Sequence, residues 1–207
     1  MTFMRIKSFS FLILVLLALA LSGCKNRPEI SRLEPDAVIL AFGNSLTYGS
    51  GAPREQSYPA QLQKLLNRLV VNAGIPGEVS AAGLARLPEV LAEHRPDLVI
   101  LCHGGNDFLR QHDTALVRGN LREMVSLIKG SGIDVILVSV PRIGLLLSPA
   151  PFYAEISEEF DIPLAGEILT EVLSEPSLKS DRIHPNARGY GIMAESFARL
   201  IEETQGS

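Results

Sequence analysis

Short apolar segments alternate along this chain with longer segments in which apolar residues recur every three or four positions. The short segments have the length of buried β-strands, and the longer ones have the period of helices with one inner face. The predicted strands are residues 37–42, 69–73, 97–102, 134–140 and 162–164. The predicted helices are residues 58–69, 82–94, 114–129 and 185–203. This alternation predicts an α/β fold with a parallel sheet.

Two of the predicted helices have an apolar side that we expect to face the sheet. The apolar positions of the helix at 58–69 are Leu62, Leu65, Leu66 and Leu69. Those of the helix at 114–129 are Leu116, Leu121, Val125 and Ile128. In both helices the spacing is roughly that of one helical face.

The first residues resemble a bacterial lipoprotein signal. Arg5 and Lys7 precede an apolar segment, residues 9–21, which ends in small residues before Cys24. Its 13 residues are few for a membrane-spanning helix, which needs about 20. The resemblance implies cleavage before Cys24 and lipidation of its thiol. Because Lys25 follows the cysteine, the resemblance also implies a location in the outer membrane, facing the periplasm. An uncleaved membrane anchor and an ordinary secretory signal are the alternatives to a lipoprotein signal.

Three segments follow from this interpretation: a signal at residues 1–23, a lipidated N-terminus and polar tether at 24–35, and one domain at 36–205. Removing Arg5 and Lys7 changes the formal net charge from -4 to -6, and no basic stripe indicates a nucleic-acid partner. With Cys24 lipidated, Cys102 has no partner for a disulfide. The four histidines form no repeated cluster with cysteines or carboxylates, so we expect no metal.

Three short motifs, far apart in the sequence, together contain the groups that an acyl-transfer site needs. They are Gly43-Asn44-Ser45-Leu46-Thr47, Gly104-Gly105-Asn106-Asp107 and Asp181-Arg182-Ile183-His184-Pro185. In this order they offer a serine after an apolar strand, a glycine-rich turn with an amide that suits an oxyanion, and an acid three residues before an imidazole. The combination predicts a serine hydrolase.

The motifs also follow the predicted strands. Ser45 comes after the first strand, Gly77 after the second and Asn106 after the third. All three therefore lie beyond the carboxyl ends of parallel strands, where ligands bind in open α/β sheets. Asp181 and His184 precede the last helix, so we expect their loop to reach the same edge of the sheet.

With these motifs the chain resembles the SGNH hydrolases, also called the GDSL family, and especially their periplasmic thioesterase, lysophospholipase and arylesterase branch. The resemblance extends from about residue 37 to residue 200 and includes Val71-Asn72-Ala73-Gly74-Ile75-Pro76-Gly77 and Gly83-Leu84-Ala85-Arg86-Leu87. It implies a three-layer α/β/α sandwich with a mostly five-stranded parallel, flavodoxin-like sheet. It also implies an esterase or thioesterase that acts on a small-molecule acyl ester and needs no cofactor.

Roles for individual residues follow from the same resemblance. It implies Ser45 as the nucleophile, His184 as its base and Asp181 as the acid that orients the imidazole. The backbone N–H groups of Ser45 and Gly77, with the Asn106 side chain, would form the oxyanion hole. Taken singly, each residue also has a structural alternative, because serine and aspartate cap helices and turns, histidine occurs at surfaces, and glycine permits tight bends.

The chain departs from the family pattern at several positions. Asn44 stands where aspartate is usual, but its carbonyl oxygen can still accept the hydrogen bonds that hold a turn. Activity should therefore survive, with an altered pH profile possible. Pro76 and Glu78 flank the implied oxyanion glycine where serine and aspartate are common. Cys102-His103 replaces an acidic and an apolar residue, and Cys102, which ends a buried strand, is predicted to belong to the core.

Substrate choice is less determined by the sequence. Leu145, Leu146 and Leu147 follow the fourth strand, and they either line a groove for an acyl chain or pack on the core. A carbohydrate O-acetyl esterase with the same fold is one alternative to an acyl esterase. A lipid-binding or scaffold lipoprotein that has lost catalysis is the other.

Overall fold

Five parallel strands form the central sheet of the domain, in the order β2-β1-β3-β4-β7. The computed structural model describes residues 28–142 and 147–206. The strands are β1 (Val38–Gly43), β2 (Leu69–Gly74), β3 (Leu98–Cys102), β4 (Asp134–Val138) and β7 (Leu164–Ala165). This is the flavodoxin-like order, and each neighbouring pair is parallel. The predicted parallel sheet is confirmed.

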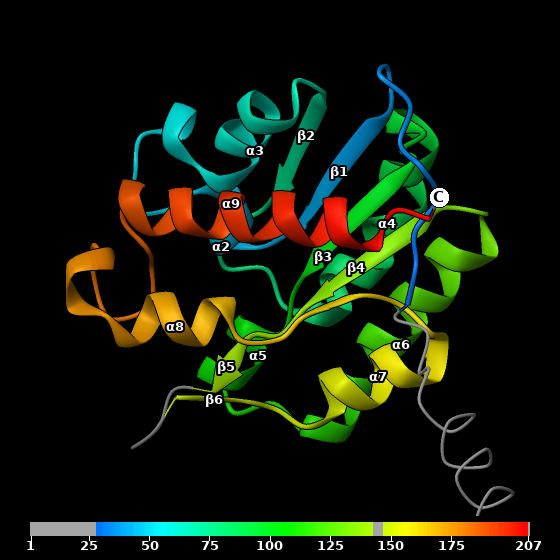
Figure 1. The fold of residues 1–207 in the computed structure, drawn as a ribbon. Helices are drawn as coiled ribbons and strands as arrows, with labels where there is room; N and C mark the ends of the chain where they lie inside the picture. Colours follow the sequence, from blue (N-terminus) through cyan, green and yellow to red (C-terminus); the bar gives the residue numbers. More distant parts are fainter. Residues whose placement is uncertain (1–27, 143–146, 207) are drawn as a thin grey trace, which may run out of the picture.

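Helices cover both faces of this sheet, so the three layers implied by the resemblance are present (Figure 1). One face carries α3 (Tyr58–Leu66) and α9 (Ala187–Thr204). The other carries α4 (Ser80–His94), α6 (Thr114–Gly130) and α7 (Phe152–Phe160). The four helices predicted from the sequence are confirmed, with ends that shift by a few residues.

Shorter elements, which the hydrophobic pattern does not predict, connect the strands and helices. They include α2 (Ser45–Tyr48), α5 (Gly105–Leu109), α8 (Ile168–Ser174), the 3₁₀ turns η1 (Arg54–Gln56) and η2 (Pro176–Leu178), and the antiparallel pair β5 (Pro141–Arg142) and β6 (Ser148–Pro149). Such short elements hold too few apolar positions for a period to be recognised. α2 and α5 matter most, because they begin at the carboxyl ends of β1 and β3.

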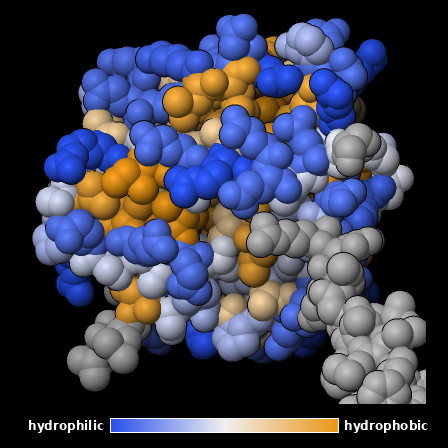
Figure 2. Space-filling model, in the orientation of Figure 1, coloured by the Kyte–Doolittle hydropathy of each residue, from blue (hydrophilic) through white to orange (hydrophobic). Residues whose placement is uncertain are grey.

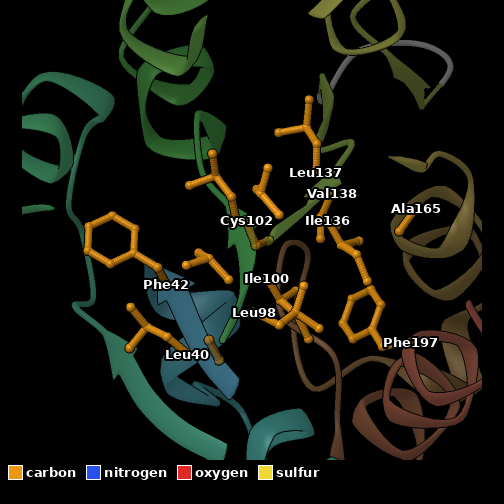
Figure 3. Close-up of a cluster of buried hydrophobic side chains, with 14 of the residues drawn as sticks. Leu40, Phe42, Leu98, Ile100, Cys102, Ile136, Leu137, Val138, Ala165 and Phe197 are labelled. Atoms are coloured by element: carbon orange, nitrogen blue, oxygen red, sulfur yellow. The ribbon is translucent and has the colours of Figure 1, made fainter. Parts of the chain in front are cut away.

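The central strands are buried on both faces, which explains why they are nearly continuous apolar segments. In Figure 3, Leu40 and Phe42 of β1, Leu98 and Ile100 of β3, and Phe197 of α9 belong to one cluster. All five side chains are completely buried. This packing fixes the strands relative to one another, and therefore fixes the origins of the loops that follow them.

The predicted inner side of α3 is only partly correct. Leu62 is completely buried, but Leu65 and Leu69 are 53% and 54% exposed. Asn67 adopts a left-handed conformation, with φ of 49°, and ends the helix, so that Leu69 belongs to β2 instead. Figure 2 shows the resulting apolar surface above α3.

The predicted inner side of α6 is wrong at one position. Leu116 is 66% exposed, and its neighbour Val117 is completely buried in its place. Val117 lies four residues before Leu121 and eight before Val125, so these three share a face, whereas Leu116 is turned away by about 100°.

Residues 28–35, which we expected to belong to a polar tether, pack on the domain. Ile30 and Leu33 are buried, and the Ile30 N–H donates to the Thr204 carbonyl oxygen at 2.8 Å. The predicted signal and Cys24 lie outside the described residues. None of the described helices combines the length and the hydrophobicity that crossing a membrane requires.

Candidate active site

The loops that follow β1 and β3 meet the loop before α9 at one edge of the sheet. They bring together Ser45, Asn106 and His184, which line a cavity of about 270 Å³. The expected convergence is confirmed for these three residues. Gly77, in the loop after β2, is not among the residues that line this cavity.

A continuous series of hydrogen-bonding groups extends from Ser45 to Asp181. The Ser45 Oγ lies 3.0 Å from His184 Nε2, and His184 Nδ1 lies 2.7 Å from Asp181 Oδ2. An imidazole that donates from Nδ1 to a carboxylate leaves Nε2 free to accept a proton. The arrangement can therefore take the proton from the serine hydroxyl.

Asp181 is held by its own loop as well as by the imidazole. Its Oδ1 accepts hydrogen bonds from the backbone N–H groups of Ile183 and His184, at 2.8 and 2.9 Å. Desolvation acts to raise the pKa of this carboxyl, but the hydrogen bonds from the His184 ring and from the two N–H groups outweigh it and lower the pKa. The carboxylate form is favoured, which suits a group that must orient a cationic imidazole.

The turn that carries Ser45 depends on its two preceding residues. The Asn44 Oδ1 accepts from the Leu46 N–H at 3.2 Å, so the amide caps α2 as its carbonyl was expected to do. A Cβ on Gly43 would lie 2.2 Å from the Cys102 carbonyl oxygen. Only glycine allows β1 to end this close to β3, and the chain then turns sharply enough to present Ser45 to the cavity.

Several N–H groups at this edge are available to bind an oxygen atom. Within the described parts of the chain, the backbone N–H groups of Ser45 and Gly77 donate to no other atom. Asn106 Nδ2 donates to the Glu78 carbonyl oxygen at 2.9 Å, and the second hydrogen of that amide remains. Gly77 has φ of 78°, a conformation that favours glycine.

Two residues next to these motifs have structural roles. The Asp107 carboxylate is buried and accepts from the backbone N–H and the hydroxyl of Ser80, both at 2.8 Å, so it caps α4. Cys102 is completely buried, in agreement with its predicted place in the core. Burial raises the pKa of its thiol to about 12, which keeps it protonated and a poor nucleophile.

The wall of the cavity is more apolar than polar. It is formed in part by Leu46, Phe108, Leu109, Val140, Leu173 and Ile183. The sequence offered no signal for this set, because its members come from five separate segments. Of the predicted leucine groove, Leu145 and Leu146 lie outside the described residues, while Leu147 is half-buried and does not line the cavity.

Sequence reasoning also missed a charged cluster beside the cavity. The Glu78 carboxylate contacts the side chains of both Arg86 and His103. The only signal was indirect, because Glu78 and His103 are positions where the chain departs from the family pattern. Among residues 28–142 and 147–206, no three histidine, cysteine or carboxylate side chains are grouped so that they could hold a metal ion.

The chain is similar to known proteins in sequence and in fold. Residues 41–192 match the GDSL-like Lipase/Acylhydrolase family. The chain is 33% identical over 174 residues to an arylesterase from Vibrio mimicus, covering 79% of this chain and 87% of that protein. It is 31% identical over 172 residues to thioesterase 1/protease 1/lysophospholipase L1 of Escherichia coli strain K12, covering 79% and 83%. A crystal structure of TesA superposes with a TM-score of 0.72 at 30% identity, covering 81% of this chain and 99% of that one.

Proposed function

Because the chain belongs to the GDSL-like lipase/acylhydrolase family, we propose that it hydrolyses acyl esters or thioesters through an acyl-enzyme on Ser45. The observation that carries the proposal is the alignment of Ser45, His184 and Asp181, at 3.0 and 2.7 Å. An inactive envelope-binding lipoprotein would have no physical need for this alignment. The proposed function is therefore catalysis and not ligand binding alone.

In the first half of the reaction, His184 Nε2 takes the hydroxyl proton as the Ser45 oxygen attacks the carbonyl carbon. The carbonyl oxygen becomes negatively charged in the tetrahedral intermediate. The N–H groups of Ser45 and Gly77 and the Asn106 amide would donate to it, and each such donor acts more strongly in the transition state than on the neutral substrate.

The first half ends when His184 gives its proton to the leaving alcohol or thiol and the bond from the carbonyl carbon to that group breaks, which leaves the acyl-enzyme. In the second half, the acyl group is released to water. The neutral imidazole then takes a proton from water as the water oxygen attacks the acyl-enzyme. Collapse of this second intermediate returns the proton to Ser45 and frees the carboxylic acid.

The apolar wall of the cavity supports an acyl or aryl group as the part of the substrate that binds there. Burying one CH₂ group stabilises binding by about 0.8 kcal/mol, so a longer chain gains affinity as long as it stays in contact with the wall. The proposed substrates are arylesters, lysophospholipids or acyl-thioesters. A carbohydrate O-acetyl ester, the alternative, would leave most of this apolar surface unused.

The proposed location is the cell envelope. Lipidation of Cys24 would tether the enzyme to a membrane, in the outer membrane facing the periplasm. The support for this proposal is the sequence of residues 1–25 alone. Labelled palmitate should be incorporated into the parent protein and not into Cys24→Ser, and a parent protein without label would contradict lipid anchoring.

The catalytic proposal is tested with p-nitrophenyl esters of increasing chain length, run beside a lysophospholipid, an acyl-CoA and an acetylated sugar. Ser45→Ala should lower kcat on every substrate by at least about 10,000-fold while the melting temperature is kept. Near-parental turnover by pure Ser45→Ala protein would refute the proposal. Preference for acetate release from the sugar would instead identify the carbohydrate esterase.

A further inference from the structure

The Glu78 carboxylate is buried beside the cavity, in the loop that follows β2. Its side chain is only 6% exposed. The Arg86 guanidinium donates to it twice, from Nε to Oε1 and from an Nη to Oε2, both at 2.7 Å. His103 Nε2 lies 3.1 Å from Oε2. Three ionisable side chains therefore share one small buried volume, which is costly unless each hydrogen bond is made.

The Arg86 guanidinium connects this cluster to two of the catalytic loops. The nitrogen that binds Glu78 Oε2 also donates to the Ala73 carbonyl oxygen at 2.9 Å and to the Gly43 carbonyl oxygen at 3.3 Å. Gly43 lies two residues before Ser45, and Ala73 is the next-to-last residue of β2, the strand that leads to Gly77. The guanidinium also lies over the Phe42 ring, 4.0 Å from its centre, which fixes its plane.

His103 connects the cluster to the third loop. Its side chain is completely buried, and its Nδ1 accepts from the Gly104 N–H at 3.1 Å. A ring that accepts at Nδ1 carries its proton on Nε2, so it donates to Glu78. Gly104 begins the segment that carries Asn106, and a Cβ on Gly83 would lie only 2.5 Å from His103 Nε2, so glycine there makes room for the ring.

The other side of the Gly77–Glu78 segment is held by the segment after β3. Asn106 Nδ2 donates to the Glu78 carbonyl oxygen, and an Arg110 Nη donates to the Gly77 carbonyl oxygen, both at 2.9 Å. The Glu78 backbone and side chain are therefore held by different partners. Displacement of the Gly77–Glu78 segment would break several of these hydrogen bonds together.

We propose that Glu78, Arg86 and His103 form a positioning cluster that holds the loops carrying Ser45, Gly77 and Asn106 in the geometry that binds the oxyanion. None of the three side chains touches the reacting atoms; they act through the backbone of the three loops. This inference rests on the proposed function. Its physical basis is that a displacement of about 1 Å at a reacting centre can reduce the rate by about 100-fold.

The test compares Glu78→Gln with the parent enzyme. The glutamine keeps the size of the side chain but offers one acceptor atom where Arg86 and His103 need two. We expect kcat to fall about 10- to 100-fold with KM changed by less than about threefold. Affinity for a trifluoromethyl ketone, whose adduct with Ser45 places a negative oxygen in the hole, should fall by a similar factor. A purely structural role would lower the melting temperature without weakening the analogue selectively.

Two further variants keep the inference falsifiable if Glu78→Gln does not fold. Glu78→Asp keeps the carboxylate and should retain most of kcat. His103→Leu removes the donor to Glu78 and should lower kcat as Glu78→Gln does, and the double variant should be no worse than about the larger single effect. Glu159→Gln, which breaks an exposed ion pair with Arg122, is the matched control and should leave kcat unchanged.

The outcomes separate this inference from the proposed function. If Ser45→Ala abolishes hydrolysis while Glu78→Gln and His103→Leu keep parental kcat and parental analogue affinity, the positioning cluster is refuted and the reaction stands. If Ser45→Ala leaves hydrolysis intact, the proposed function falls first.

Discussion

Two charged assemblies lie at the same edge of the sheet, and they differ in exposure. The Asp181 side chain is 53% exposed, whereas that of Glu78 is 6% exposed. In the proposed reaction His184 exchanges protons with substrate and water, so the pair that it forms with Asp181 must be reachable. Glu78, Arg86 and His103 exchange no proton in that reaction, and burial makes their hydrogen bonds stronger than they would be in water.

The two assemblies also obtain their geometry in different ways. Asp181 is fixed by N–H groups of its own loop, two and three residues away. Glu78 is fixed by Arg86, eight residues further along the chain in α4, and by His103, 25 residues further and directly after β3. Loss of a reactive group should therefore remove a chemical step and nearly abolish kcat. Loss of a positioning group should lower kcat only in part. The variants below test this distinction.

The largest effect after Ser45→Ala is expected for Asp181→Asn. An amide at this position presents a donor to His184 Nδ1 and favours the tautomer that cannot accept the Ser45 proton. We expect kcat to fall by about 10,000-fold, with little change in the melting temperature. Steady-state kinetics on a p-nitrophenyl ester measures this, and a loss below about tenfold would show that Asp181 does not set the tautomer.

Asn106→Ala should have the next largest effect. Removing one oxyanion donor typically costs about 100- to 1,000-fold in kcat. The substitution also removes the hydrogen bond to the Glu78 carbonyl oxygen. Asn106→Asp is the useful companion, because it keeps the size of the side chain but places a negative charge beside the oxyanion. An active Asn106→Asp enzyme would argue against a donor role.

The pH dependence of stability should report the buried assembly. Burial acts to raise the pKa of the Glu78 carboxyl, but hydrogen bonds from His103 and Arg86 outweigh it, and the pKa is lowered. Such a group stabilises the fold above its unfolded pKa of about 4.3, and the stabilisation is lost as the pH falls through the folded value. Between about pH 5 and about pH 3, the free energy of unfolding of the parent should fall more steeply than that of Glu78→Gln. Parallel curves in urea denaturation would show that the carboxylate is not preferentially ionised in the fold.

The smallest effect is expected for Asn44→Asp, which restores the residue usual in the family. The Asn44 oxygen already accepts the Leu46 N–H, so the turn itself should not change. We expect kcat within about threefold of the parent, with the pH profile shifted by the added charge beside Ser45. A large gain in kcat would mean that the Asn44 amide impairs catalysis and does not replace the usual aspartate.

The apolar pattern of the sequence predicted most of the fold, but it did not predict every buried position. The alternation of apolar strands and periodic helices predicted the parallel sheet, since strands buried on both faces leave a strong signal. It misjudged Leu65, Leu69 and Leu116, because a left-handed residue at Asn67 and a 100° difference between neighbouring helical positions do not show in the apolar pattern.

The reactive residues were found because they occur in short motifs, while the cavity wall and the positioning cluster were not. Leu173 lies on a short helix without a recognisable period, and Arg86 lies within a motif whose physical purpose the sequence does not state. The contact between Glu78 and His103 joins two loops that are 25 residues apart. Only the fold reveals that these two departures from the family pattern contact each other.

Labelling with a fluorophosphonate is the sharpest test of Ser45 as a nucleophile, because this reagent phosphonylates a serine whose hydroxyl is activated by a base. We expect one adduct in the parent protein, mapped by mass spectrometry to Ser45, with no adduct in Ser45→Ala and much slower labelling in His184→Ala. An adduct on another serine, or none on folded parent protein, would contradict it.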